Sequence, residues 1–259
     1  MTEASNSFVF LHGLTFDRRM WEPVLAALPE GTPAIAPDLP GHGGAPPIPG
    51  RGLGPVADHV HAAVVAAGFE RPVVVGHSIA GPIATIYAGE HPTAGVVSVD
   101  SSLRFEPFAA GLQALRPQLE GPGFDAGWEM FKASMHMERV PAEHRELVRA
   151  GERASQPVVL QYQADLLERP LADVAADRDA GTEQLRMERL PYLALFGKEI
   201  DPDDRAWYAR ELPHAQVEVW PVGHHFPHLA EPQRFADRMI AFAASACAAQ
   251  RRIRSQPSV

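Results

Sequence analysis

Residues 73–81 read Val-Val-Val-Gly-His-Ser-Ile-Ala-Gly, the most informative stretch of this chain. Three β-branched residues predict a short buried strand, and the apolar pattern beyond Pro82 predicts a helix. Ser78 stands between them, with Gly76 two positions before it and Ala80 two positions after it. A serine on such a tight strand–turn–helix bend exposes its hydroxyl above the end of the sheet. The stretch therefore predicts a nucleophilic serine, although Ala80 stands where the motif usually has glycine.

Composition narrows the class of protein. The 259 residues, with 46% hydrophobic content, suffice for one large domain or for a core with an inserted subdomain. The formal net charge of −9 argues against nucleic acid or an anionic membrane as a partner. Cys247 is the single cysteine, which excludes an intrachain disulfide and fits a reducing compartment. Without signal-peptide features or a bilayer-length apolar run, we expect a soluble cytoplasmic protein.

Short apolar runs alternate with helical patterns along the chain. The runs that predict strands are residues 8–11, 34–36, 73–75, 96–99, 192–196 and 217–220. The first helical patterns cover residues 17–28, 54–67 and 79–90. This alternation predicts an α/β fold with a mostly parallel sheet covered on both faces. In such sheets the ligand site lies beyond the carboxyl ends of the strands.

Residues 103–189 interrupt the alternation, because they contain helical patterns and no clear strand. An excursion of this length predicts a helical lid inserted in a core of residues 1–102 and 190–247. Most of its bulky side chains should form its own core, and some should line an apolar pocket. Our candidates for substrate contact are Trp128, Phe131 and Met135. The last residues, 248–259, are predicted to be a disordered tail.

A serine nucleophile needs a base to accept its proton. The best candidate is His225, which follows the last predicted strand and precedes Phe226 and Pro227. His224, His225 and His228 could suggest a metal cluster, but no carboxylate completes a ligand spacing and Pro227 interrupts the helix. We therefore expect neither a metal nor a cofactor.

The oxyanion that forms when a serine attacks a carbonyl group needs two preorganised N–H donors. Ile79 directly follows the serine at the start of a helix and should supply one donor. Leu14 should supply the other, because Gly13 lets the backbone after the first strand approach closely. Three other histidines should be structural hydrogen-bonding groups in the surrounding loops: His12, His42 and His77.

At this point the chain resembles the α/β-hydrolase-fold serine hydrolases, the lid-bearing esterases, lactonases and C–C hydrolases. The resemblance rests on residues 10–13 (Phe-Leu-His-Gly), 38–43 (Asp-Leu-Pro-Gly-His-Gly), 76–78 (Gly-His-Ser) and 225–232 (His-Phe-Pro-His-Leu-Ala-Glu-Pro). It implies that Ser78 is the nucleophile, that His225 is the base and that residues 103–189 are the lid.

The chain departs from the family pattern at its beginning. The family normally has two further strands before the His-Gly segment, whereas here the first strand starts within ten residues of Met1. We therefore expect about six parallel strands, with residues 34–36 near an exposed sheet edge. An exposed edge can pair with another chain, so the protein is either a monomer or a homodimer.

The second departure concerns the acid that orients the histidine. The resemblance places it at Ile200, which cannot do so. Asp201 lies one residue later, and Asp100 closes the strand at residues 96–99; Glu199 and Asp203 are further alternatives. We favour Asp100, because a strand end holds a carboxylate more rigidly than a short loop and orientation is the acid's main role.

These residues together predict a serine hydrolase that cleaves an ester or lactone bond of a small apolar substrate through an acyl-enzyme. Haloalkane dehalogenases and epoxide hydrolases are disfavoured, because they need a carboxylate where Ser78 stands. The alternatives are a C–C bond hydrolase, a cofactor-free oxygenase or lyase, and a ligand-binding protein with the same fold.

Overall fold

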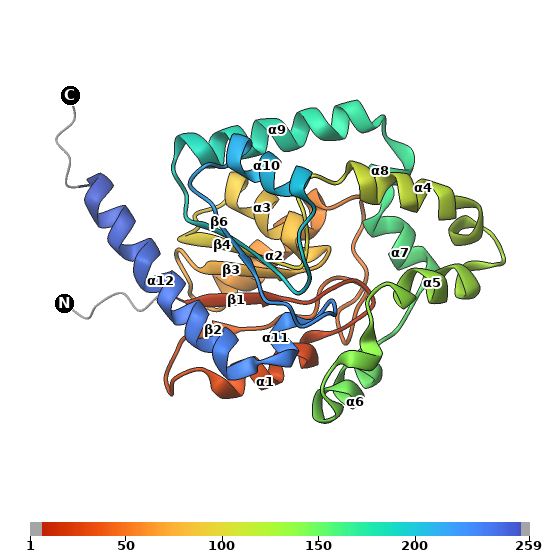
Figure 1. The fold of residues 1–259 in the computed structure, drawn as a ribbon, viewed down its shortest axis with the longest axis horizontal. Helices are drawn as coiled ribbons and strands as arrows, with labels where there is room; N and C mark the ends of the chain where they lie inside the picture. Colours follow the sequence, from red (N-terminus) through yellow and green to blue (C-terminus); the bar gives the residue numbers. More distant parts are fainter. Residues whose placement is uncertain (1–6, 255–259) are drawn as a thin grey trace.

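The computed structural model describes residues 7–254, and Figure 1 shows the fold. In this part of the chain six parallel strands form one sheet, in the order β2-β1-β3-β4-β5-β6. The strands are β1 (Phe8–Leu11), β2 (Ala34–Ile35), β3 (Val73–His77), β4 (Gly95–Val99), β5 (Tyr192–Phe196) and β6 (Gln216–Val219). The predicted six-stranded parallel sheet is confirmed, and the short strand β2 lies at one edge.

Helices form the rest of the regular structure. Those between and after the strands of the core are the 3₁₀ helix η1 (Arg18–Trp21), α1 (Glu22–Ala27), α2 (Gly54–Ala66), α3 (Ala80–Glu90), α10 (Pro202–Glu211), α11 (Pro227–Ala230) and α12 (Pro232–Arg254). The helix predicted at residues 17–28 is thus divided into η1 and α1. Asp17 caps η1, because its side chain accepts a hydrogen bond from the Arg19 N–H. Pro23 explains the division, since proline lacks an N–H and suits the first turn of α1.

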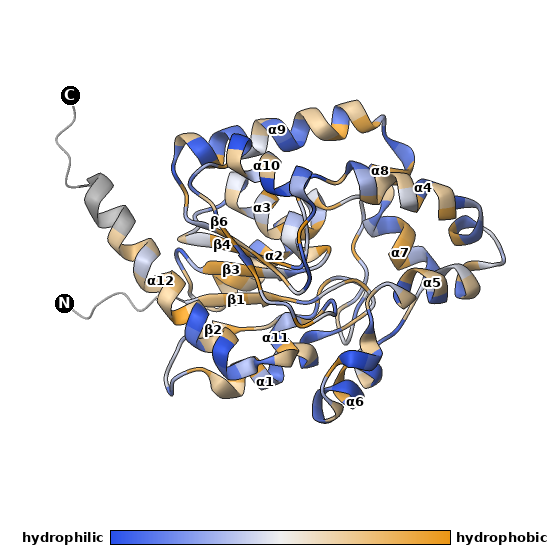
Figure 2. Ribbon diagram, viewed as in Figure 1, coloured by the Kyte–Doolittle hydropathy of each residue, from blue (hydrophilic) through white to orange (hydrophobic). Residues whose placement is uncertain are grey.

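Both faces of the sheet are buried. Successive residues of a strand point to opposite sides of the sheet, so each strand contributes side chains to both faces. On one face Val9 and Val74 pack with apolar residues of α2, α3, α9 and α10. On the other face Phe8 and Phe10 pack with residues of α1 and α12. Figure 2 shows the hydrophobic strands at the centre of the molecule. Burial on two faces accounts for the continuous apolar runs of the sequence.

Residues 103–189, called the insertion below, connect β4 to β5. The insertion contains α4 (Glu106–Glu120), α5 (Phe124–Ala133), the 3₁₀ helix η2 (Met137–Arg139), α6 (Ala142–Gly151), α7 (Gln156–Tyr162), α8 (Ala164–Glu168) and α9 (Leu171–Met187). Helices α4 to α8 lie together on the right of Figure 1, and α9 returns above the sheet. The insertion stands where the sequence places the lid, and its movement as a lid stays a prediction.

The C-terminal helix is longer than expected. Helix α12 continues to Arg254, so the predicted disordered tail is wrong for residues 248–254, while residues 255–259 lie outside the described residues. The physical reason is composition, because this alanine-rich stretch contains neither glycine nor proline before Pro257. Within residues 7–254 no helix is both long and apolar enough to cross a membrane.

Candidate active site

Ser78 occupies a sharp bend between β3 and α3. Its φ of +56° lies in the left-handed region, which residues other than glycine rarely adopt. Its N–H donates to the Val99 carbonyl over 2.9 Å, and its carbonyl accepts from the Gly81 N–H over 2.8 Å. A Cβ atom at Gly76 would lie 1.9 Å from the Ala80 carbonyl oxygen, so only glycine fits there. The bend predicted from the sequence is therefore present, and the methyl group of Ala80 fits within it.

Asp100 and His225 form a hydrogen-bonded pair beside this bend. Asp100 directly follows β4, the neighbour of β3 in the sheet, and its carboxylate Oδ2 lies 2.5 Å from the His225 Nδ1 atom. Its Oδ1 atom accepts from the Gly197 N–H over 2.7 Å. Burial would raise the pKa of the Asp100 carboxyl, but these two hydrogen bonds outweigh it and lower the pKa. Asp100 is therefore an ionised carboxylate that holds one ring nitrogen of His225.

The other carboxylates considered for this position lie elsewhere. Asp201 caps α10, where its side chain accepts from the Asp203 N–H over 2.8 Å, and it lies 3.6 Å from Arg104. Glu199 and Asp203 are both exposed. The structure thus brings Asp100, and not these three residues, into contact with the His225 ring.

The His225 loop is held by residues from two directions. The Nε2–H of His77, the residue before Ser78, donates to the His225 carbonyl over 2.7 Å. From the insertion, the Met135 carbonyl accepts from the His225 N–H over 3.0 Å, and Arg139 Nη1 donates to the Gly223 carbonyl over 3.0 Å. Arg139 is not among the site residues predicted from the sequence. No local pattern marks it, because the contact joins residues 84 positions apart.

Three buried histidines support the loops as predicted. His12 Nε2 accepts from the Leu39 N–H over 2.9 Å, and His42 Nε2 accepts from the Thr15 N–H over 3.0 Å. Burial lowers the pKa of His12 to about 3, that of His77 to about 3, and that of His42 below its usual range. All three rings are therefore neutral at pH 7 and act as hydrogen-bonding groups.

Leu14 and Ile79 line the same cavity as Ser78, Asp100 and His225. Within residues 7–254 neither the Leu14 N–H nor the Ile79 N–H donates to a protein acceptor. Both are therefore available to a bound group, as an oxyanion site requires. The described residues provide no hydrogen bond to the Ser78 hydroxyl either. In free enzymes the bond between nucleophile and base often tightens only when substrate binds.

The cavity has a volume of about 930 Å³ and lies between the sheet ends and the insertion. Two of the three predicted substrate contacts, Phe131 and Met135, line it. Trp128 does not. It is buried on α5 behind Phe131, whose ring stacks on it with centroids 4.8 Å apart. Phe108 contributes a further apolar wall, meeting Phe131 edge to face.

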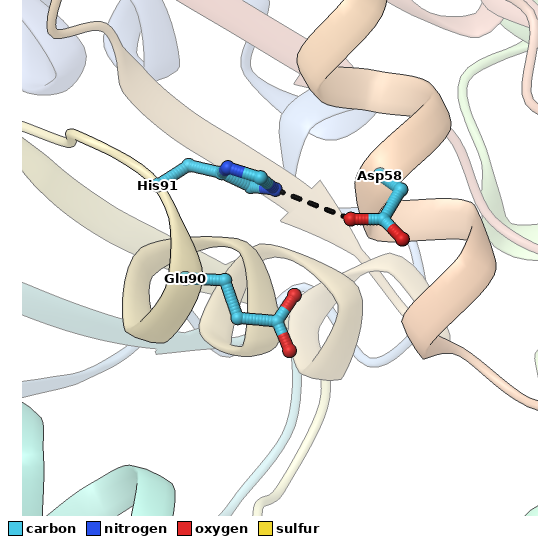
Figure 3. Close-up of side chains that lie close together, drawn as sticks. All are labelled: Asp58, Glu90 and His91. Atoms are coloured by element: carbon cyan, nitrogen blue, oxygen red, sulfur yellow. Dashed lines mark ion pairs between the residues drawn. The ribbon is translucent and has the colours of Figure 1, made fainter.

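A group of possible metal ligands lies where Asp58 of α2 faces the C-terminal end of α3. Figure 3 shows Asp58, Glu90 and His91, whose ligand atoms lie within 4.8 Å of one another. An ion pair of 3.5 Å already joins Asp58 to His91, and both carboxylates are exposed. Exposed acidic groups often gather in this way without an ion, so we assign no metal to them.

Comparisons with known proteins agree with this architecture. Residues 8–238 match the family model described as the alpha/beta hydrolase family. The 2-succinyl-6-hydroxy-2,4-cyclohexadiene-1-carboxylate synthase of Serratia proteamaculans is 25% identical over 241 residues, which cover 90% of this chain and 91% of that protein.

Solved structures show the same fold. A thermophilic esterase from Thermogutta terrifontis superposes with a TM-score of 0.72 at 24% identity, covering 93% of this chain and 90% of the other. An AqdC variant in complex with its substrate, the Pseudomonas quinolone signal, superposes with a TM-score of 0.74 at 19% identity, covering 94% and 92%. With the family model matching most of its length, the chain belongs to the alpha/beta hydrolase family.

Proposed function

We propose that this protein is a serine hydrolase that cleaves an ester or lactone bond of a small apolar substrate. One observation supports the proposal above the others: His225 is bound through Nδ1 to the buried Asp100 carboxylate, and it lines the same cavity as Ser78. The two nitrogens of an imidazole flank one ring carbon, and their hydrogen-bonding directions point away from each other. The bond to Asp100 therefore leaves Nε2 free to accept a proton.

In the proposed reaction Ser78 Oγ attacks the substrate carbonyl while His225 Nε2 accepts the hydroxyl proton. The Leu14 and Ile79 N–H groups stabilise the oxyanion, each contributing ~3 kcal/mol to the transition state. His225 then gives its proton to the leaving alcohol, and an acyl-enzyme forms on Ser78. A water molecule, deprotonated by His225, releases the acid and restores the serine.

Asp100 fixes the tautomer of His225 and stabilises the imidazolium that forms in each step. The low pKa of this carboxyl keeps it ionised throughout the neutral pH range. Phe108, Phe131 and Met135 supply the apolar walls for the body of the substrate. Covering of the cavity by the insertion would exclude bulk water from the acyl-enzyme.

A second candidate is carbon–carbon bond chemistry by a lyase or a C–C hydrolase. The relative from Serratia proteamaculans is a synthase, and it covers nearly the whole chain at 25% identity. In such a reaction the His225–Asp100 pair would move a proton without requiring an acyl group on Ser78. Covalent labelling of Ser78 and ester turnover separate the two candidates.

The decisive experiment is labelling by a fluorophosphonate together with turnover of p-nitrophenyl butyrate. We expect one label per chain and its loss in Ser78→Ala, with ester turnover lost in the same variant. Ser134→Ala removes another serine of the cavity wall and should still be labelled once. Unlabelled wild type, or ester turnover in Ser78→Ala close to that of the wild type, would reject the proposal.

A further inference from the structure

The cavity has a charged part as well as an apolar part. Its cationic side chains are four arginines and one lysine: Arg51, Arg104, Arg169, Arg178 and Lys198. A substrate carrying a carboxylate would need one of these cations to replace the water that it loses on binding. Whether these cations already have carboxylate partners in the protein therefore decides whether an anionic substrate can bind.

Arg104 and Arg178 are already neutralised by carboxylates of the chain. The Arg104 guanidinium forms an ion pair with Asp204 and lies 3.6 Å from Asp201, and only 20% of its side chain is exposed. Arg178 lies 2.7 Å from Glu106 and 2.9 Å from Asp179. Its planar group also lies over the rings of Phe105 and Trp207, at 4.9 and 5.3 Å from their centroids. Both guanidinium groups are thus held by partners on several sides.

Arg169 and Arg51 are engaged in the same way. Arg169 lies 2.6 Å from Asp177 and 3.2 Å from Asp165, and Arg51 forms an ion pair with Glu168. Lys198, the remaining cation, is exposed to solvent. The positive charge of each arginine in the cavity wall is therefore neutralised by a carboxylate of the protein itself.

Carboxylates outnumber cations on the wall. The cavity wall contains five cations and seven carboxylates. The carboxylates are those of Glu90, Asp100, Asp165, Asp177, Glu199, Asp201 and Asp204. A hollow lined by an excess of one charge concentrates its field, which repels ligands of the same sign. An anionic substrate would meet this field and would also have to break an existing ion pair to gain an arginine.

We infer that the cavity selects an uncharged ester or lactone and discriminates against substrates that carry a carboxylate; this inference rests on the proposed function. The relative from Serratia proteamaculans is named for a carboxylate. The present chain is 25% identical to that relative, but its cavity is suited to neutral compounds. The ion pairs supply the selectivity, because they leave no arginine free for an anionic group.

Three aryl acetates that differ only in the charge of one substituent test the inference. They are para-acetoxybenzoate, para-acetoxybenzamide and para-(trimethylammonio)phenyl acetate. We expect kcat/KM, divided by the alkaline hydrolysis rate of each ester, to be roughly tenfold lower for the benzoate than for the benzamide. The trimethylammonium ester should be cleaved at least as well as the benzamide. Added salt should reduce the differences in kcat/KM among the three esters, because it screens the charges of the cavity.

Substitution of one carboxylate should weaken the selectivity against the benzoate. Asp204→Asn keeps the shape of the side chain and removes the nearer of the two carboxylate charges beside Arg104, while Asp201 remains 3.6 Å away. The benzoate-to-benzamide ratio of kcat/KM should rise roughly fivefold. The matched variant Glu211→Gln removes the carboxylate of an ion pair with Arg210 outside the cavity, and it should leave the ratio unchanged.

The outcomes separate this inference from the function on which it rests. Equal normalised kcat/KM for the three esters, with Ser78 still labelled by a fluorophosphonate, would overturn the inference and keep the hydrolase. A preference for the benzoate would do the same. No turnover of any ester together with no labelling would overturn the proposed function itself.

Discussion

The carboxylate of Asp100 lies 2.5 Å from the imidazole of His225, although 125 positions separate the two residues in the chain. Asp100 has a φ of +49°, in the left-handed region, at the point where β4 ends. Its N–H donates to the Leu195 carbonyl of β5, and its Oδ1 accepts from the Gly197 N–H. The neighbouring strand thus fixes both the backbone and the side chain of the residue that orients His225.

Asp100→Asn should lower kcat for p-nitrophenyl butyrate by about 10³- to 10⁴-fold. The amide preserves the shape of the side chain but can hold His225 in the wrong tautomer. Asp201→Asn is the matched variant, because Asp201 caps α10 and does not contact the ring. Its kcat should change less than about twofold, at a stability cost of ~1 kcal/mol or less. Similar losses in the two variants would mean that neither carboxylate is the acid.

Gly76→Ala should destabilise the fold by about 2 kcal/mol or more and remove ester turnover. The added Cβ would lie 1.9 Å from the Ala80 carbonyl oxygen, so the bend that carries Ser78 must open. Gly111→Ala provides the control, since a Cβ there meets no atom within 4 Å. Urea denaturation of both variants measures the difference. A Gly76→Ala protein with wild-type stability and turnover would refute the tight bend.

Arg139→Ala should lower kcat about tenfold with little change in Tm. Arg139 is half exposed and donates to the Gly223 carbonyl, so its loss should loosen the loop that carries His225 more than the core. Arg149→Ala removes an exposed arginine paired with Glu146 on α6 and serves as the control. A fall in Tm large enough to account for the lost activity would show that Arg139 contributes to the stability of the fold rather than to the position of the His225 loop. An unchanged kcat would show that the loop does not need it.

His228→Phe should make stability less sensitive to acid. His228 is fully buried, and neither of its ring nitrogens has a hydrogen-bond partner among the described residues. Burial lowers its pKa well below the usual value, whereas the unfolded chain takes up a proton near pH 6.5. The free energy of unfolding therefore falls as the pH falls below about 6.5, by up to about 1.4 kcal/mol per pH unit for this residue.

The phenylalanine variant cannot bind that proton, and its ring can keep the contact with Trp21, whose centroid lies 4.4 Å from that of His228. Urea denaturation between about pH 5 and pH 7 should show similar stability near pH 7 and a shallower loss toward pH 5. His12 and His77 should keep contributing to the loss in both proteins, because burial lowers the pKa of each to about 3. Parallel curves for the two proteins would contradict the neutral buried state of His228.

Elements whose information is local could be predicted from the sequence. The strand at β3 follows from three consecutive β-branched residues, and the bend at Ser78 follows from the small residues Gly76 and Ala80. The end of the chain was predicted less well. The prediction there relied on the position of the segment rather than on the helix-forming residues that extend α12 to Arg254.

What remained open in the sequence depended on contacts between distant segments. Trp128 and Phe131 are three residues apart on α5, and only the packing of that helix decides that Phe131 reaches the cavity while Trp128 is buried behind it. The sequence by itself determined the strands, the helices and the serine on its bend, because neighbouring residues encode them. Only the tertiary structure decided that Asp100 rather than Asp201 meets His225. That choice depends on where parallel strands end relative to one another, which no single segment records.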